Sequence, residues 1–506
     1  MRMSGDRLNG LDAAFLKLDT LASPMNIGAL AVFDAARPVV VADLVGLLAE
    51  RLGPVERFRM RPRRVSFPPG AVRWERDPRF QVDAHIRVGC LPAPGNRDQL
   101  ADYVAQAVAR QLDLTRPLWE VHLIIGLADG NFALLAKTQH ALADGMGIAH
   151  LIAAIVDDPP TLPEPDNQVA GGVGLTEALR AVRRPDQWLT APTRLANQVA
   201  TRVTESGRQA VRGLGIAASV VRRARVAPSS PLLGPPGRVS LRRALHTARL
   251  DRPSLGLICQ THQVTTNDVV LAVLSGVLRR WLTHRGHPVD ELSLRALVPV
   301  DLRAHNQNAV PGEGNELSGY LCPLPVAEPD PLRRLDLVHT AMERNKAAGP
   351  YRGPGAVAFL AGTLPGLVRT VATPLAGQRA GLLFDVLVTS GTLPAGQWPV
   401  AGSPMKENFG VAPLASGHGL SVAVSKTRQF VGLTLYSDPS IVPDAAVLRD
   451  AVPPSLAELR PAVPIQRAAA TDAPAAAAPA ARRDKPTASA NRRAPAKTSR
   501  DTNPKS

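Results

Sequence analysis

The feature that most constrains the fold of this 506-residue chain is a polar turn between an apolar strand and an apolar helix. Residues 132–136 form an apolar run typical of a strand, and residues 146–156 have the length and composition of a buried helix. The turn between them has the sequence Gln139-His140-Ala141-Leu142-Ala143-Asp144-Gly145. Functional residues often lie where a strand passes into a helix, so we expect an α/β fold with a site at this turn.

Within this turn, His140 is the candidate functional residue. An unperturbed imidazole has a pKa of about 6.5 and can take and return a proton near neutral pH. Asp144 can hold the loop or the imidazole in place, and Gly145 permits a backbone turn that a Cβ would block. A match of this kind also arises by chance in roughly a few per cent of chains of this length, and a lone histidine is more often structural. The assignment therefore depends on the rest of the chain.

The composition is that of a globular protein with a basic surplus. Hydrophobic residues make up 45% of the chain, the net charge is +16 and the pI is about 10.7. Such a surplus points to nucleic acid, an anionic membrane or an anionic ligand such as coenzyme A as the partner. Much of it lies in residues 175–226 and 467–506. Nucleic acid is disfavoured because the arginines lack interleaved aromatic residues and no binding motif accompanies them.

Cysteine usage and hydropathy favour the cytoplasm. Cys90, Cys259 and Cys322 are scattered, odd in number and without zinc spacing, which favours a reducing compartment. The N-terminus lacks the apolar segment of a signal peptide. No uninterrupted apolar run reaches the roughly 18 residues that a membrane span needs; residues 354–378 come nearest, but Pro365 and Arg369 interrupt them. A peripheral position on the inner face of the cell membrane stays open.

Alternation and helical spacing predict the elements of the first half. We expect helices at 11–16, 41–52 and 98–112, and strands at 27–33, 80–88 and 121–125. The turn 128–131 should close a hairpin onto the strand that precedes His140. Five arginines between residues 57 and 64 are expected on a solvated strand face or loop.

A second set of alternating elements is expected from about residue 239 to 450. Thr266, Asn267 and Asp268 precede a strong helix at 269–283, and asparagine and aspartate are natural N-cap residues. Strands are expected at 293–298 and 382–388, and a hairpin at 417–424 with 430–436. The resulting organisation is a first domain at 1–165, a basic helical linker at 166–235, a second domain at 236–460 and a disordered basic tail at 461–506.

The basic segment 175–226 allows two interpretations. It can be a connecting helical segment that packs on the two halves with its arginines in solvent. It can also form a basic amphipathic surface for an anionic bilayer. Its apolar positions recur at helical spacing and are needed for packing in either case.

Five motifs occur in an order that resembles the bacterial bifunctional wax ester synthase/acyl-CoA:diacylglycerol acyltransferase family. They are the opening 11–16 with Pro24-Met25, Pro117-Leu118-Trp119, the His140 motif, Asn267-Asp268 and the stretch 314–318. The likeness covers about residues 6–460. It implies an α/β fold of two similar domains like chloramphenicol acetyltransferase, with the active histidine in a tunnel between them. Acyl-CoA and the acyl acceptor would enter this tunnel from opposite mouths.

The resemblance also implies roles for individual residues. His140 would be the general base, and Asp144 would be mostly structural. Supporting positions would be Gln139, Gly145, Asn267 and Asp268, and substrate-binding positions would be Pro117, Leu118, Trp119, Asn315 and Ser318. The acceptor would be diacylglycerol or a long-chain alcohol, at a membrane or lipid droplet surface. Acyl-CoA is then a substrate, and neither a cofactor nor a metal is implied.

This chemistry suits a single histidine. A thioester is already activated, and an imidazole that takes the alcohol proton accelerates such a step by about 10²–10⁴-fold. No cysteine or serine has the neighbours of an activated nucleophile. Candidate donors to the oxyanion, which the sequence does not separate, are Asn315, Ser318, Thr389 and Ser390.

Two positions depart from the family pattern. Gln139 stands where the family usually has a second histidine, and residues 389–394 replace an Asn-Val-Pro-Gly-Pro-like turn. Two alternatives therefore stay open. The first is an acyltransferase for another hydroxyl, such as that of a polyketide or glycolipid. The second is a chain that binds lipid or acyl-CoA without turnover, which Gln139 favours and the intact His140, Asp144 and Gly145 disfavour.

Overall fold

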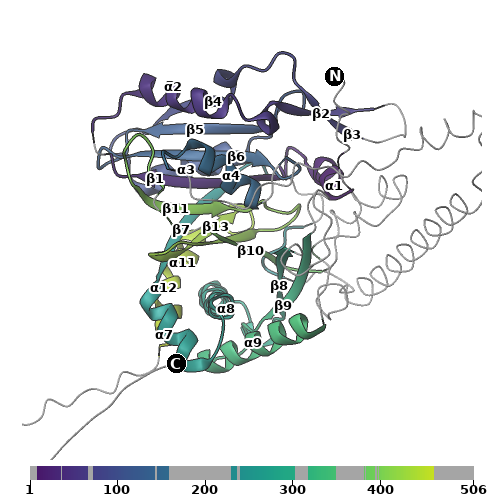
Figure 1. Ribbon diagram of the computed structural model, residues 1–506. Coiled ribbons are helices and arrows are strands. Elements are labelled where there is room, and N and C mark those ends of the chain that lie inside the picture. The colour runs from purple at the N-terminus through teal and green to yellow at the C-terminus, as the bar shows by residue number, and fades with distance from the viewer. Residues whose placement is uncertain are drawn as a thin grey trace, which may run out of the picture. The chain divides into compact units, whose positions relative to one another are not determined.

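The computed structural model in Figure 1 describes most of the chain between residues 8 and 460. The described residues are 8, 10–35, 37–65, 72–142, 145–158, 230–235, 240–301, 317–348, 381, 383–393, 396 and 398–460. The chain divides into the unit Met1–Pro461, which holds every element below, and the unit Ala462–Ser506. The expectations for the segment 175–226, for residues 354–378 and for the basic tail lie outside the described residues.

The first sheet has five strands in the order β11-β1-β6-β5-β4. The strands are β1 (Asn26–Phe33), β4 (Ile86–Cys90), β5 (Trp119–Ile125), β6 (Phe132–Gln139) and β11 (Met405–Val411). Strands β4 and β5 are parallel, and the other neighbours are antiparallel. The hairpin predicted between β5 and β6 is confirmed.

Helices cover both faces of this sheet: α1 (Gly10–Leu18), α2 (Val41–Leu52), α3 (Arg97–Ala109) and α4 (Gly145–Ile155). Side chains alternate between the two faces of a strand, and β1 is buried on both. Ala29 and Phe33 pack in one core with residues of α2 and α4. Leu30 and Val32 pack in the other core with residues of α3. The sheet is therefore a central layer, and α3 lies on the face opposite to α2 and α4.

Two short segments differ from simple strands. The basic segment predicted to be a solvated strand face or loop contains η1 (Glu56–Arg59) and β2 (Met60–Arg64), which pairs with β3 (Val72–Arg76) in a separate hairpin. The strand predicted at 80–88 is wrong in its first half, because η2 (Val82–His85) precedes β4. His85 turns inward there to contact the Trp119 carbonyl at 2.9 Å, which a regular strand with alternating apolar residues would not do.

The second sheet has six strands in the order β7-β13-β12-β10-β8-β9. They are β7 (Ala244–Asp251), β8 (Leu294–Asp301), β9 (Leu317–Leu324), β10 (Val386–Thr392), β12 (Leu420–Lys426) and β13 (Phe430–Ser437). Strand β10 is parallel to β8 and β12, and the other neighbours are antiparallel. The hairpin predicted for β12 and β13 is confirmed. The strand predicted at 382–388 begins only at Val386. Directly before it, the Asp385 carboxylate accepts a hydrogen bond from Arg295 N at 2.7 Å.

Helix α8 (Thr266–His284) runs through the middle of the second half (Figure 1). Every residue from Asp268 to Leu278 is buried, within one core that includes residues of the sheet and of the surrounding helices. These helices are α7 (Arg252–His262), α9 (Pro331–Ala348), α11 (Ala445–Asp450) and α12 (Val452–Ala457), with the short η4 (Val289–Glu291).

The start of α8 differs from the prediction in its capping residue. Thr265 is the N-cap, and its side chain accepts from Asp268 N while the Asp268 carboxylate accepts from Thr265 N. This reciprocal pair is a capping box, so the helix begins before Asn267. Asn267 therefore has its side chain free for contacts with other elements.

Strand β11 connects the two sheets. It follows β10 in the chain but pairs with β1, beside which its green ribbon lies in Figure 1. Its Gly410 N donates to Ser425 Oγ of β12 at 2.6 Å, and a Cβ on Gly432 of β13 would come within 2.9 Å of the Phe409 ring. Its Glu407 carboxylate pairs with Arg97 of α3 and with Arg249 of β7. A segment from the second half thus completes the sheet that carries His140.

Candidate active site

His140 lies immediately after β6, in the turn that leads to α4, so the predicted passage from strand to helix is confirmed. Its N–H donates to the Met25 carbonyl at 2.8 Å, and Leu142 N donates to the Gln139 carbonyl at 2.9 Å. The residue is half-buried. Its main chain is therefore fixed to the start of β1, and the imidazole Nδ1 is buried.

Gln139 shapes the turn that carries the histidine. Its side chain is fully buried, and its Oε1 accepts a hydrogen bond from Ala141 N at 2.5 Å. Its own N–H donates to the Leu118 carbonyl at 3.1 Å. Among the described residues, its Nε2 has no hydrogen-bond partner. A buried main-chain donor needs such an acceptor, so Gln139 stabilises the turn without being a base.

Phe15 of α1 is part of the site, although the sequence reasoning gave it no role there. Its ring is stacked on the His140 imidazole, with centroids 4.0 Å apart and planes inclined by 16°. Stacking restricts the ring plane of the histidine, and an aromatic face also attracts an imidazolium cation. The sequence signal for this residue is the motif at 11–16, which also carries the family resemblance.

Pro117, Leu118 and Trp119 support the strand of the histidine. All three are buried, and the Leu118 carbonyl accepts hydrogen bonds from Gln139 N and from Thr138 Oγ1 at 3.0 Å. The Trp119 indole donates to the Phe58 carbonyl at 2.8 Å and has no exposed area. The structure thus brings this motif together with Gln139 and His140. Direct contact of the three residues with substrate stays a prediction.

Asn267 and Asp268 attach α8 to neighbouring elements. Asn267 Oδ1 accepts from Lys426 Nζ of β12 at 2.7 Å and from Ser390 Oγ of β10 at 3.3 Å. Asp268 is fully buried, and its Oδ2 lies 3.0 Å from His339 Nδ1 of α9. These contacts fix the start of α8 against the ends of two strands and against α9.

Other residues expected at the site are described in part or not at all. Asp144 and Asn315 lie outside the described residues, and the backbone of Gly145 begins α4. Ser318 is described by its backbone alone, which pairs with Val300 in the second sheet. Thr389 and Ser390 lie in β10. The choice among them as oxyanion donors stays a prediction.

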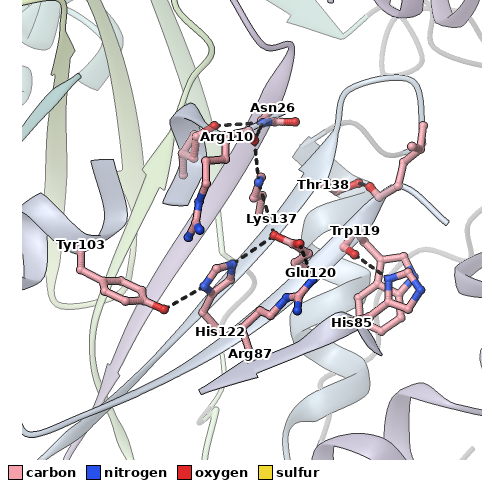
Figure 2. Close-up of polar contacts among 12 residues, drawn as sticks. Asn26, His85, Arg87, Tyr103, Arg110, Trp119, Glu120, His122, Lys137 and Thr138 are labelled. Atoms are coloured by element: carbon pink, nitrogen blue, oxygen red, sulfur yellow. Dashed lines mark hydrogen bonds and ion pairs between the residues drawn. The ribbon is translucent and has the colours of Figure 1, made fainter. Parts of the chain in front are cut away.

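A buried polar network lies on the α3 face of the first sheet (Figure 2). Lys137 of β6 is 1% exposed, and its Nζ donates to the Arg110 carbonyl at 2.7 Å and lies 3.4 Å from Glu120 Oε2. Glu120 Oε2 also lies 3.3 Å from His122 Nε2, and His122 Nδ1 lies 3.0 Å from the Tyr103 hydroxyl. The sequence reasoning missed this network. Its signal is a lysine that directly follows the apolar run 132–136, three residues before His140.

Burial and charge act in opposite directions within the network. For Glu120, burial would raise the pKa, but His122, Lys137 and Arg87 together lower it to about 2. For Lys137, burial outweighs the attraction of Glu120, so its pKa lies below the usual 10.5. Burial also lowers the pKa of His122. A neutral His122 with its proton on Nε2 donates to Glu120 and accepts from Tyr103 through Nδ1.

Two of the hollows in the described part of the chain lie away from His140. A small apolar void of about 10 Å³ lies between β1, β6 and α4, beside Ala29, Ala136 and Ile152. An open groove of about 920 Å³ lies at the end of α3, beside Arg110, Leu21 and Leu241. Neither is lined by His140, so the tunnel between the two halves stays a prediction.

The mixed α/β fold is shared with a wax ester synthase/diacylglycerol acyltransferase and with condensation domains. The wax ester synthase/diacylglycerol acyltransferase from Marinobacter aquaeolei VT8 superposes with a TM-score of 0.62 at 22% identity, covering 90% of this chain and 98% of that one. The first condensation domain of the calcium-dependent antibiotic synthetase superposes with a TM-score of 0.53 at 17% identity, covering 91% and 96%. At such identities these likenesses establish the fold alone.

Sequence comparison identifies the family. Residues 8–270 match the wax ester synthase/diacylglycerol acyltransferase catalytic domain, and residues 313–460 match the C-terminal domain of the same family. A protein of Mycobacterium tuberculosis named as a probable diacylglycerol O-acyltransferase is 32% identical over 472 residues, which cover 90% of this chain and 96% of the relative. The chain belongs to the wax ester synthase/diacylglycerol acyltransferase family and is an acyltransferase of that type, so the resemblance found in the sequence is confirmed.

Proposed function

We propose that this chain transfers a long-chain acyl group from acyl-CoA to diacylglycerol, and also to long-chain alcohols, with His140 as the general base. The observation that carries the proposal is the placement of His140. It is half-buried in a turn held by Met25 and Gln139, and its ring is stacked on Phe15. Such a fixed imidazole, in a family of acyltransferases, suits the removal of a proton from a bound hydroxyl.

The reaction needs one proton to move twice. As the acceptor oxygen attacks the thioester carbonyl, the His140 imidazole takes the hydroxyl proton and becomes an imidazolium. The tetrahedral intermediate then collapses, the carbon–sulfur bond breaks, and the imidazolium returns the proton to the leaving thiolate. The products are an ester and free coenzyme A, and no covalent bond to the enzyme forms.

The supporting residues have distinct proposed roles. Gln139, Gly145 and Asp144 shape the turn of His140, and Asn267 with Asp268 fix the wall formed by α8. Leu118 and Trp119 brace the acyl pocket behind β6, where both are fully buried. The oxyanion donors are proposed among Asn315, Ser318, Thr389 and Ser390, all of which lie in or beside the second half of the chain.

We propose in addition that the chain, in the cytoplasm, contacts the anionic surface of the inner membrane leaflet or of lipid droplets. Leu21 and Leu241, the two most exposed large apolar side chains among the described residues at 71% and 63%, line the same groove. Arg110 and Arg242 also line it, and within the described ranges neither guanidinium has an ion-pair partner. Asp102 and Asp113 line the groove as well, and exposed leucines beside arginines suit the headgroup region of an anionic bilayer.

A panel of acceptors tests the acyl transfer. Purified full-length chain is incubated with radiolabelled palmitoyl-CoA and diacylglycerol, a long-chain alcohol, a glycolipid or a polyketide, and the labelled products are separated. We expect label in triacylglycerol and, in smaller amount, in wax ester. Label only in another acceptor would overturn the acceptor assignment, and binding of acyl-CoA without any product would overturn the enzymatic proposal.

Among the described helices, none is long and apolar enough to cross a bilayer. We propose that the lipid contact is a surface contact made by the groove.

A further inference from the structure

We propose that Lys137 is a positioning residue for His140, because its buried ammonium attaches the end of α3 to the strand that carries the histidine. This inference rests on the proposed role of His140. Lys137 is nearly fully buried, and the shorter of its two hydrogen bonds is with a main-chain oxygen, Arg110 O, at 2.7 Å. Burying a charged lysine costs free energy unless its ammonium is hydrogen-bonded. We therefore ask what the hydrogen bond to Arg110 O contributes.

The end of α3 receives hydrogen bonds from side chains of other elements. The last carbonyls of a helix have no partner within the helix, and a cation near them also interacts favourably with the helix dipole. Asn26 Nδ2 donates to Val108 O at 2.9 Å and to Arg110 O at 2.8 Å. Lys137 provides the second donor to Arg110 O. Side chains from the first residue of β1 and from β6 thus cap α3 together.

A chain of hydrogen bonds leads from the same loop to His140. Gln111 Nε2 donates to Asp19 Oδ2 at 2.7 Å, and Asp19 Oδ1 accepts from Met25 N at 2.6 Å. The Met25 carbonyl accepts the His140 N–H. The loop at 110–111 therefore reaches the histidine by two routes, one along β6 from Lys137 and one through Met25 beside Asn26. A shift of this loop would move His140 from both sides.

The loss of Lys137 and the loss of its counter-charge, Glu120, have different expected effects. Glu120 lies directly opposite Lys137 across the β5–β6 pair and balances its charge. Removing either partner alone leaves a buried charge uncompensated, whereas removing both does not. Only the loss of Lys137 takes a donor from Arg110 O. The effects on stability and on the position of His140 can therefore be measured apart.

The experiment compares Lys137→Met, Glu120→Gln and the double variant Glu120→Gln/Lys137→Met. The matched control is Lys406→Met, an exposed lysine on β11 of the same sheet. Thermal melting, kcat and the KM for palmitoyl-CoA are measured with diacylglycerol as acceptor. We expect the double variant to melt above Lys137→Met, but its kcat to stay about tenfold or more below wild type with KM within about twofold. Glu120→Gln should lose stability and keep most of its kcat.

Two results would overturn the positioning role of Lys137. A folded double variant with wild-type kcat would overturn the positioning role and leave Lys137 a purely structural residue. So would a kcat loss of the same size in Lys406→Met. His140→Ala is assayed alongside, because wild-type turnover in that variant would mean that the proposed function has failed, which is distinguishable from a failure of the Lys137 inference alone.

Discussion

At the scale of single residues, three contacts between described residues hold His140 and its turn. Met25 O holds its N–H, Gln139 closes its turn, and Phe15 covers one face of its ring. These contacts set the direction of the imidazole before any substrate is present. Such preorganisation is what general-base catalysis requires of its surroundings.

Gln139 allows a prediction at this scale. Neutral histidine can also offer an acceptor to Ala141 N, so Gln139→His should change the rate of thiol release from acyl-CoA by no more than about tenfold, or about 1.4 kcal/mol. Gln139→Ala removes that acceptor, leaves a buried N–H unsatisfied and should lower the rate further. Wild type and both variants are compared in one assay with diacylglycerol present. A nearly silent wild type with a large rescue by Gln139→His would instead indicate a lipid-binding protein.

Glu120 allows a prediction on pH. Its folded-state pKa of about 2 lies below its usual 4.5, so the ionised carboxylate stabilises the fold above pH 4.5, and this stabilisation is lost as the pH falls towards 2. The side chain is 21% exposed, and the contribution is on the order of 3 kcal/mol. Urea unfolding should therefore show wild type more stable than Glu120→Gln at pH 6, with a difference that shrinks by pH 3. Glu343→Gln, at an exposed ion pair on α9, is the control and should differ little at either pH. An undiminished difference for Glu120→Gln at pH 3 would contradict the assignment.

At the scale of elements, periodicity predicted those whose neighbours are close in the chain. The hairpins β5–β6 and β12–β13 followed from apolar alternation and turn residues, and α2 was predicted with its observed bounds. Strand β11 was missed because its partner β1 lies more than 370 residues earlier, and its sequence includes the buried Glu407. That glutamate is stable there because Arg97 and Arg249 come from other elements, which no local pattern records.

At the scale of the whole molecule, the ordered motifs predicted the family and the fold class, whereas the polar contacts behind the site could not be predicted. Lys137, Glu120 and Asn26 meet only because β1, β5 and β6 lie side by side under α3. In the sequence, Lys137 is notable because it follows an apolar run, but nothing indicates that Glu120 and Asn26 are its neighbours. The position of His140 was predictable because strand, turn and helix follow one another directly in the chain.

The lipid contact is also a property of the whole molecule, because its groove joins segments more than 200 residues apart. Replacing Leu21 and Leu241 with serine should weaken binding of the full-length chain to phosphatidylglycerol vesicles by at least about tenfold. Leu257 and Leu332, each 46% exposed on α7 and α9, form the matched control pair when replaced in the same way. Vesicle co-sedimentation measures both, at low and high salt. Equal losses for the two pairs would exclude the groove as the contact surface.

The most direct test of the account is the rate of acyl transfer from palmitoyl-CoA to diacylglycerol in His140→Ala. Removing the general base should lower this rate by at least about a hundredfold, while the melting temperature and the circular dichroism spectrum stay those of a folded chain. The fold should survive because the contacts that hold the turn use the main chain of His140, which alanine retains. A folded His140→Ala protein with a rate near that of wild type would contradict the central claim.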